Sequence, residues 1–139
     1  MGTTHQDIEI NATVDTVWNA IRDFHDMGWA PNVITSVDRV GDKAGTEPGA
    51  GRVLNGVFHE TLHTLDDDAM TFTYSIDDGP TPISKDEVSN YVGRVVVEAA
   101  GEGARVEWTS IWEKNDEAGH EFCHPIYLAL LGDMKASLE

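Results

Sequence analysis

The sequence has 139 residues, and its 25 acidic and nine basic side chains give a formal net charge of −16. This length fits one domain, residues 1–139, with a real hydrophobic core, and the ordinary apolar content excludes a disordered chain. The acidic balance argues against nucleic acid and anionic membranes as partners, because phosphate binding needs clustered Lys and Arg side chains.

Several classes of protein are disfavoured by what the sequence lacks. No apolar run approaches the roughly 18 residues of a membrane span, and the N-terminal segment lacks the basic and apolar regions of a signal peptide. Cys123 is the single cysteine, which fits a reducing compartment. The acidity fits either a gain in solubility or a salt-adapted source. We expect a cytoplasmic monomer or homodimer.

The N-terminal part of the chain begins with a strand and continues with helix. Residues 6–12 alternate between apolar and polar side chains, which is typical of a half-buried strand. Residues 13–24 repeat their apolar side chains at intervals of three and four, as an amphipathic helix does, and Thr13 is a suitable N-cap. A second, short helix is expected just before Pro31.

The rest of the chain reads as strands followed by one long helix. Residues 33–114 form a series of alternating segments separated by turns, which predicts sequential antiparallel hairpins. Residues 117–139 have helical periodicity, with Pro125 either kinking the helix or marking its first turn. The sequence thus predicts an α+β fold of about six or seven antiparallel strands with helices on one face.

Alternation also predicts which side chains face the interior. The aromatic residues among them either fill a solid core or line a cavity, and buried Tyr and Trp tips that need hydrogen-bond partners favour a cavity with a few polar contacts. From the strands and the last helix we expect the following residues in a ligand site: Phe58, Glu60, Phe72, Tyr74, Tyr91, Trp108, Ser110, Trp112, Ile126, Tyr127 and Leu130.

Among the candidate site residues, Arg52 and Glu60 are the pair with the most specific predicted chemistry. Both face inward by the same parity, unless Gly56 resets the register. They form either a structural ion pair or a site in which Arg52 anchors a ligand carboxylate or enolate and Glu60 orients it or acts as a base. Burial would raise the pKa of the carboxyl group, whereas the arginine would lower it.

Other motifs carry little chemistry. His59 and His63 lie about 13 Å apart if they share one strand, too far for one metal ion, and His120 and His124 form at most a half-site. Cys123 is either an inert buried thiol or a nucleophile, without a visible base and orienting group. The glycine-containing turns do not connect a strand to a helix, so no phosphate loop is present. We expect no metal and no cofactor.

Three stretches, together with the terminal helix, resemble one known superfamily. They are "IEINATVDTVWNAIRDFHDMGWAPNV", "GRVLNGVFHETLHTLDDD" and "NYVGRVVVEAAGEGARVEW". The chain is similar to SRPBCC proteins, the START and Bet v 1-like superfamily, and specifically to its bacterial polyketide cyclase/dehydrase-like group. The resemblance implies a helix-grip fold. In this fold two short helices follow the first strand, and a curved antiparallel sheet wraps around the long C-terminal helix. An apolar cavity lies between the sheet and that helix.

The long segment Asp77–Val88 interrupts two predicted strands. Hairpin loops usually have about two to five residues, so a loop of about a dozen is either an ordinary flexible connection or a lid. By the resemblance it lies where relatives carry a gate over the cavity mouth, with Gly79, Pro80 and Pro82 as gate residues.

Three functions remain open at this point. The first is binding of a small hydrophobic or aromatic ligand, such as a lipid or polyketide, with Arg52, Glu60, Tyr74, Tyr91 and Trp112 as polar contacts. The second is a polyketide cyclase or aromatase-like enzyme in which Arg52 stabilises an enolate and Glu60 or Tyr91 moves protons. The third is a protein-interaction module that uses the long loop and the acidic surface.

Overall fold

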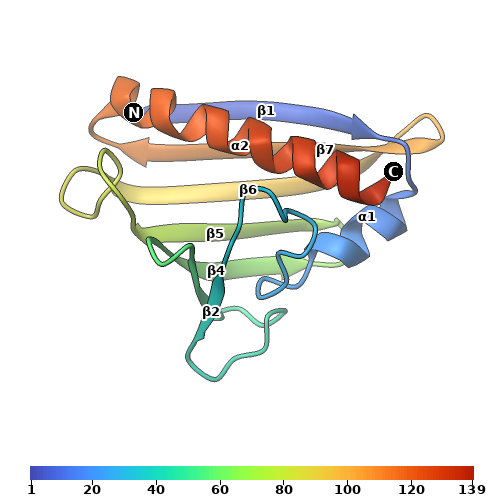
Figure 1. The fold of residues 1–139 in the computed structure, drawn as a ribbon, viewed down its shortest axis with the longest axis horizontal. Coiled ribbons are helices and arrows are strands. Elements are labelled where there is room, and N and C mark those ends of the chain that lie inside the picture. Colours follow the sequence, from blue (N-terminus) through green and yellow to red (C-terminus); the bar gives the residue numbers. More distant parts are fainter.

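The structure is a computed structural model that describes residues 1–139, and its elements form a single layer of strands covered by helices (Figure 1). They follow in the order β1 (Gly2–Ile10), α1 (Val14–Ile21), β2 (Val37–Val40), β3 (Gly51–Leu54), β4 (Phe58–Asp66), β5 (Thr71–Asp78), β6 (Ser89–Ala100), β7 (Gly103–Glu113) and α2 (Asp116–Leu138).

The seven strands form one open antiparallel sheet in the order β1-β7-β6-β5-β4-β3-β2. Neighbours in sequence pair as hairpins from β2 to β7, and β1 closes against β7 at the far edge. Helix α2 runs across one face of this sheet, alongside β1 and β7 (Figure 1). The predicted α+β helix-grip architecture is therefore confirmed.

Helix α1 begins and packs as its sequence predicts. The hydroxyl oxygen of Thr13 accepts a hydrogen bond from the backbone N–H of Thr16 at 3.1 Å, which satisfies one of the free donors of the first turn. Val17, Trp18 and Ile21 lie on its buried face. This face covers β6 and β7 at the end of the sheet opposite the start of α2 (Figure 1).

The second short helix expected before Pro31 does not form, and this part of the prediction was wrong. Residues 22–36 contain turns, a bend and irregular backbone but no helix. The carboxylate of Asp23 accepts from the backbone N–H of His25, and that of Asp26 accepts from Gly28, both at 2.9 Å. Such side chain-to-backbone bonds compete with helical hydrogen bonds and favour turns.

Helix α2 has 23 residues and contains Pro125 in its interior, not in its first turn. It places Cys123, Tyr127, Leu130 and Leu131 on the face that meets the sheet. Neither helix of the protein combines the length and the apolar composition needed to cross a lipid bilayer.

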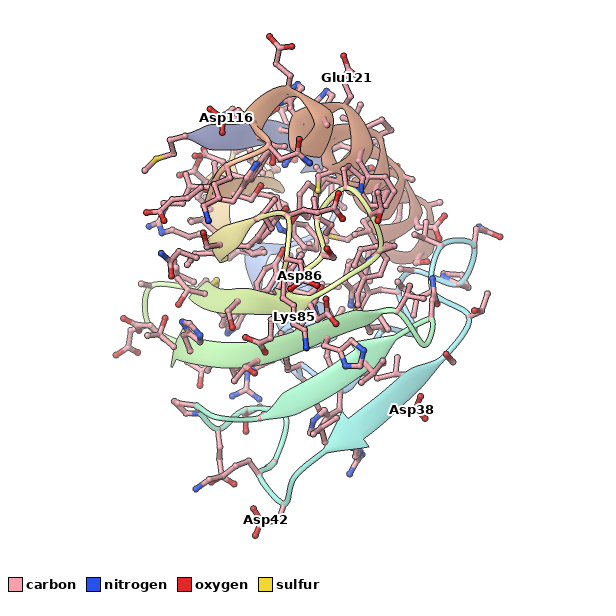
Figure 2. All side chains as sticks on the ribbon, turned by 90° about the vertical axis from the view of Figure 1, so that its left-hand side faces the viewer. Asp38, Asp42, Lys85, Asp86, Asp116 and Glu121 are labelled. Atoms are coloured by element: carbon pink, nitrogen blue, oxygen red, sulfur yellow. The ribbon has the colours of Figure 1, made fainter.

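The acidic side chains are spread over the surface. Figure 2 shows Asp38 and Asp42 at the β2 end and Asp116 and Glu121 on α2, all pointing away from the interior. Arg105 forms ion pairs with Asp7, Glu98 and Glu107. This is one of the few places where the acidic charges are neutralised. The acidity thus belongs to the solvent-facing surface.

Candidate functional site

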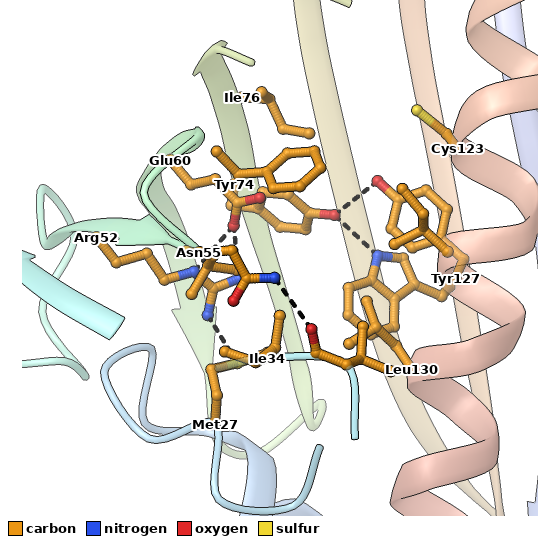
Figure 3. Close-up of a pocket in the computed structure, with 15 residues that line it drawn as sticks. Met27, Ile34, Arg52, Asn55, Glu60, Tyr74, Ile76, Cys123, Tyr127 and Leu130 are labelled. Atoms are coloured by element: carbon orange, nitrogen blue, oxygen red, sulfur yellow. Dashed lines mark hydrogen bonds and ion pairs between the residues drawn. The ribbon is translucent and has the colours of Figure 1, made fainter. Parts of the chain in front are cut away.

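A pocket of about 240 Å³ lies between the sheet and α2 (Figure 3). Twelve of its 15 lining residues are hydrophobic, and three carry polar or charged side chains, which is the usual composition of a small-molecule site. The predicted site residues that line it are Arg52, Phe58, Glu60, Tyr74, Trp108, Ile126, Tyr127 and Leu130.

The β3–β4 hairpin sets the polar end of this pocket. Arg52 and Glu60 are directly opposed residues of the two strands. The intervening turn, residues 55–57, contains Asn55 and Gly56 at positive φ values of 54° and 71°. Three-residue hairpin loops commonly use such left-handed positions. Gly56 therefore belongs to a turn, and the hairpin keeps both charged side chains on the inward face.

Arg52 and Glu60 form a buried ion pair (Figure 3). Arg52 Nε and Nη2 donate to Glu60 Oε1 at 2.9 and 2.6 Å, and only 4% and 7% of the two side chains remain exposed. Arg52 Nη1 donates to the backbone oxygen of Phe24 at 2.9 Å, and the guanidinium lies 3.7 Å from the centroid of the Phe24 ring. These contacts compensate the desolvation of the cation and occupy all three of its nitrogens.

Glu60 keeps one oxygen free. Both hydrogen bonds from Arg52 end on Oε1, and no protein group donates to Oε2. The side-chain polar atoms that are fully enclosed without a partner are Trp29 Nε1 and Trp112 Nε1, so Oε2 is open to the pocket. Burial raises the pKa of Glu60 above its ordinary value, and the charge and hydrogen bonds of Arg52 offset this only in part.

Tyr74, Trp108 and Tyr127 belong to the opposite wall, and their polar tips form a hydrogen-bonded chain that continues to Tyr91, outside the pocket lining. Trp108 Nε1 donates to Tyr74 Oη at 2.9 Å, and the hydroxyl of Tyr127 bonds to those of Tyr74 and Tyr91 at 2.9 and 2.6 Å. Burial raises the pKa of all three phenols well above its ordinary value. The three phenols therefore stay protonated at neutral pH and are joined by hydrogen bonds through Tyr127.

Four predicted ligand contacts lie away from this pocket. The ring of Tyr91 stacks on that of Trp112, with centroids 5.2 Å apart and planes 6° apart. Ser110 Oγ bonds to Thr4 Oγ1 at 2.6 Å, and Phe72 packs edge-on against Phe24. Because these side chains contact other protein groups, their assignment as ligand contacts has no support from this geometry.

Seven lining residues were missing from the predicted site. Leu54 and Ile76 lie on inward strand faces, so strict use of alternation would have included them. Cys123, for which the sequence left an inert buried thiol or a nucleophile open, lines the pocket, and burial raises the pKa of its thiol, which fits an inert role. The remaining residues lie on connections, where no periodicity reveals orientation: Met27, Val33, Ile34 and Asn55.

The long loop after β5 is held by hydrogen bonds to Asp78 at its start and from Asn115 before α2. The carboxylate of Asp78 accepts from the backbone N–H groups of Gly79 and Lys85, each at 3.0 Å, and Asn115 Nδ2 donates to the backbone oxygen of Pro82 at 2.9 Å. Ile83 is buried at its centre. Residues 79–88, including Pro80, contribute nothing to the pocket wall, so a gating role of this loop stays a prediction.

His120 and His124, the candidate half-site, have structural contacts. His120 Nδ1 donates to the backbone oxygen of Thr3 at 2.8 Å, and His124 Nδ1 donates to Gln6 Oε1 at 2.9 Å. No three His, Cys, Asp or Glu side chains converge as metal ligands would. The chemistry of the pocket is therefore that of an apolar cavity with one free carboxylate oxygen.

Comparison with known proteins gives consistent results along the whole chain. The family model described as "Polyketide cyclase / dehydrase and lipid transport" matches residues 1–139. No functionally curated protein matches the sequence significantly.

Solved structures share the fold over nearly their full lengths. A protein from Nitrosospira multiformis is 36% identical, with a TM-score of 0.96 over 99% of this chain and 96% of its own. The protein XoxI from Bacillus cereus is 26% identical, with a TM-score of 0.83 over 99% and 96% of the two chains. The major latex-like protein 151 of Panax ginseng is 19% identical, with a TM-score of 0.79 over 99% and 97%, and shows the fold alone.

Proposed function

Because the chain belongs to the family of polyketide cyclases, dehydrases and lipid transport proteins, we propose that it binds a small, mainly apolar molecule between the sheet and α2. The observation that carries this proposal is the pocket itself. Its walls are apolar, and its polar groups are few and gathered at one end. Displacing water from such walls favours an apolar ligand, whereas the polar end fixes the orientation of the ligand.

Filling the pocket tests this function directly. Ile126 lies on α2 and lines the pocket, and Leu128 lies two residues further along on the exposed side of the same helix. A panel of small aromatic and medium-chain aliphatic compounds would be screened by saturation-transfer NMR against the wild type. We expect Ile126→Trp to abolish the signals of the binding compounds and Leu128→Trp to leave them unchanged.

The outcome separates a pocket from incidental surface binding. Equal signals from both variants would place binding outside the pocket. Absence of signals from the wild type would remove the support for a binding function of this kind. Circular dichroism of each variant checks that the fold is retained.

A second candidate function is catalysis of proton transfer in the same pocket. The observation that favours it is the free Oε2 of Glu60, a carboxylate oxygen of raised pKa that faces the pocket. A carboxyl group of raised pKa is better matched to proton transfer near neutral pH. Arg52 is less suited to stabilise an enolate, because its nitrogens already donate to Glu60 and Phe24. An enzyme would lose turnover in Glu60→Gln while it still bound its substrate.

A further inference from the structure

The polar groups that line the pocket differ in what they still offer to a ligand. Arg52 directs Nε and Nη2 to Glu60 and Nη1 to Phe24. Asn55 Nδ2 donates to the backbone oxygen of Val33 at 3.0 Å, and its Oδ1 accepts from the backbone N–H of Thr35 at 2.7 Å. Each of these nitrogen and oxygen atoms therefore already has a protein partner, and one N–H of Arg52 Nη2 and one of Asn55 Nδ2 are left over.

The aromatic wall is engaged as well. The indole N–H of Trp108 is taken up by Tyr74, and the hydroxyl groups of Tyr74 and Tyr127 bond to each other. Among the side-chain oxygens that line the pocket, the one without a hydrogen bond from the protein is Glu60 Oε2, on a side chain of which only 7% is exposed. Figure 3 shows Glu60 among the pocket residues, and a ligand that satisfies its Oε2 has to donate a hydrogen bond.

The charges of Arg52 and Glu60 limit which chemical group of a ligand can donate this hydrogen bond. Arg52 and Glu60 neutralise each other, so the pocket has no net charge to offer. A carboxylate ligand would bring a second negative charge beside Glu60, and an ammonium ligand would bury a cation whose counter-charge is already paired. Both cost free energy in an apolar surrounding. A neutral hydroxyl group donates without either cost.

The volume of the pocket limits the size of the ligand skeleton. A pocket of about 240 Å³ holds roughly eight groups of the size of a water molecule, each taking about 30 Å³. This volume lies below the about 300–1,000 Å³ that is usual for sites of drug-sized ligands, so it favours small molecules. A single substituted ring or a medium-length alkyl chain fits.

We propose that the pocket selects small neutral hydroxyl compounds, phenols or alcohols, whose O–H group donates to Glu60 Oε2, and that it discriminates against the matching carboxylates. This inference rests on the proposed binding function and gives the polar end of the pocket its role. It favours the structural ion pair over the other alternative that the sequence left open, in which Arg52 anchors a ligand carboxylate or enolate.

Three probes of one skeleton test the selectivity on the wild-type chain. They are 4-ethylphenol, its methyl ether 4-ethylanisole and 4-ethylbenzoate, titrated by isothermal calorimetry at neutral pH. We expect the phenol to bind about tenfold or more tighter than the ether, because one hydrogen bond to a charged acceptor is lost. The benzoate is expected to be the weakest of the three.

Failure of this inference is distinguishable from failure of the binding function. Equal affinity of the phenol and the ether would overturn the selectivity while the pocket remained a binding site. Tightest binding of the benzoate would show that Arg52 is the anchor after all. No binding of any probe would overturn both proposals.

Glu60→Gln provides a second test. The amide oxygen can accept from Arg52 as Oε1 does, so the amide N–H₂ group would face the pocket as a donor. We expect the advantage of the phenol over the ether to shrink to about twofold or less. The matched control Glu98→Gln, on the exposed outer face of β6, should keep the wild-type ratio. An unchanged ratio in Glu60→Gln would overturn the inference, and if this variant does not fold, the wild-type probes decide.

Discussion

The interior between the sheet and α2 has two ends, and only one of them contains the pocket. At the filled end, Trp112 stacks on Tyr91 and its indole lies against Gly2 and Gly119, whose missing side chains make room for it. At the pocket end, Arg52 faces turns and aliphatic side chains that leave about 240 Å³ unfilled.

The two ends show what strand alternation can and cannot decide. Alternation assigns a side chain to the inner face, because successive residues of a strand point to opposite sides. Whether the inner face is filled depends on what approaches it from the helix and the connections. Gly119 on α2 allows an indole to fill one end, whereas the connection that carries Met27 and Ile34 stays far enough away to leave the other end open.

The largest effect should come from removing the carboxylate at the polar end of the pocket. Glu60→Ala leaves the buried cation of Arg52 without its counter-charge, so we expect the free energy of unfolding to fall by about 3–5 kcal/mol in urea titrations. The exposed pair of Glu98 with Arg105 provides the control, and Glu98→Ala should cost about 1 kcal/mol or less. Similar losses in the two variants would mean that the pocket end is well hydrated.

Replacing a side chain by a larger one should lower the free energy of unfolding at the filled end but not at the pocket end, and we expect this effect to be of intermediate size. Ser110 lies at the filled end, where its hydroxyl bonds to Thr4, and Ile126 lines the pocket. We expect Ser110→Leu to lower the free energy of unfolding by about 1–3 kcal/mol through overpacking. Ile126→Phe should change it by about 0.5 kcal/mol or less. Equal destabilisation, measured by chemical denaturation, would contradict the contrast between the ends.

The smallest effect concerns two glycines of α2. A Cβ atom at Gly119 would lie 2.8 Å from the Trp112 ring, whereas nothing lies within 4 Å of one at Gly132. We expect Gly132→Ala to raise the free energy of unfolding by about 0.5–1 kcal/mol through helix propensity. Gly119→Ala should lower it by about 1 kcal/mol, because the clash with the indole outweighs that gain. If thermal melts showed that both substitutions raise the stability, the filled end would have room for an additional methyl group.

Much of the fold was predictable because its elements have strong periodic patterns. The inward faces of β6 and β7, with Tyr91, Trp108 and Trp112, follow from alternation alone and are buried as expected. The expected second short helix is absent because Asp23 and Asp26 accept hydrogen bonds from backbone N–H groups that a helix would need. The positions of the helix-breaking residues did not reveal this. Local side-chain chemistry decided that segment.

The site was predictable in part. Arg52 and Glu60 meet because the turn at residues 55–57 preserves their parity, and the conformation of Asn55 at positive φ is not visible in a hydrophobic pattern. The pocket residues on the connections, such as Met27 and Ile34, could not be found, since irregular backbone has no period. The ordered loop after β5 likewise depends on individual contacts of Asp78 and Asn115.

The directly opposed placement of Arg52 and Glu60 on paired strands also limits how this protein can change through mutation. Losing either residue first leaves a buried, uncompensated charge, so single-step routes away from the pair pass through unstable intermediates. Apolar wall residues such as Ile34 or Leu130 carry no such constraint and can be exchanged one at a time at modest cost. New ligand preferences are therefore reached most readily by reshaping the walls around a polar end that stays in place.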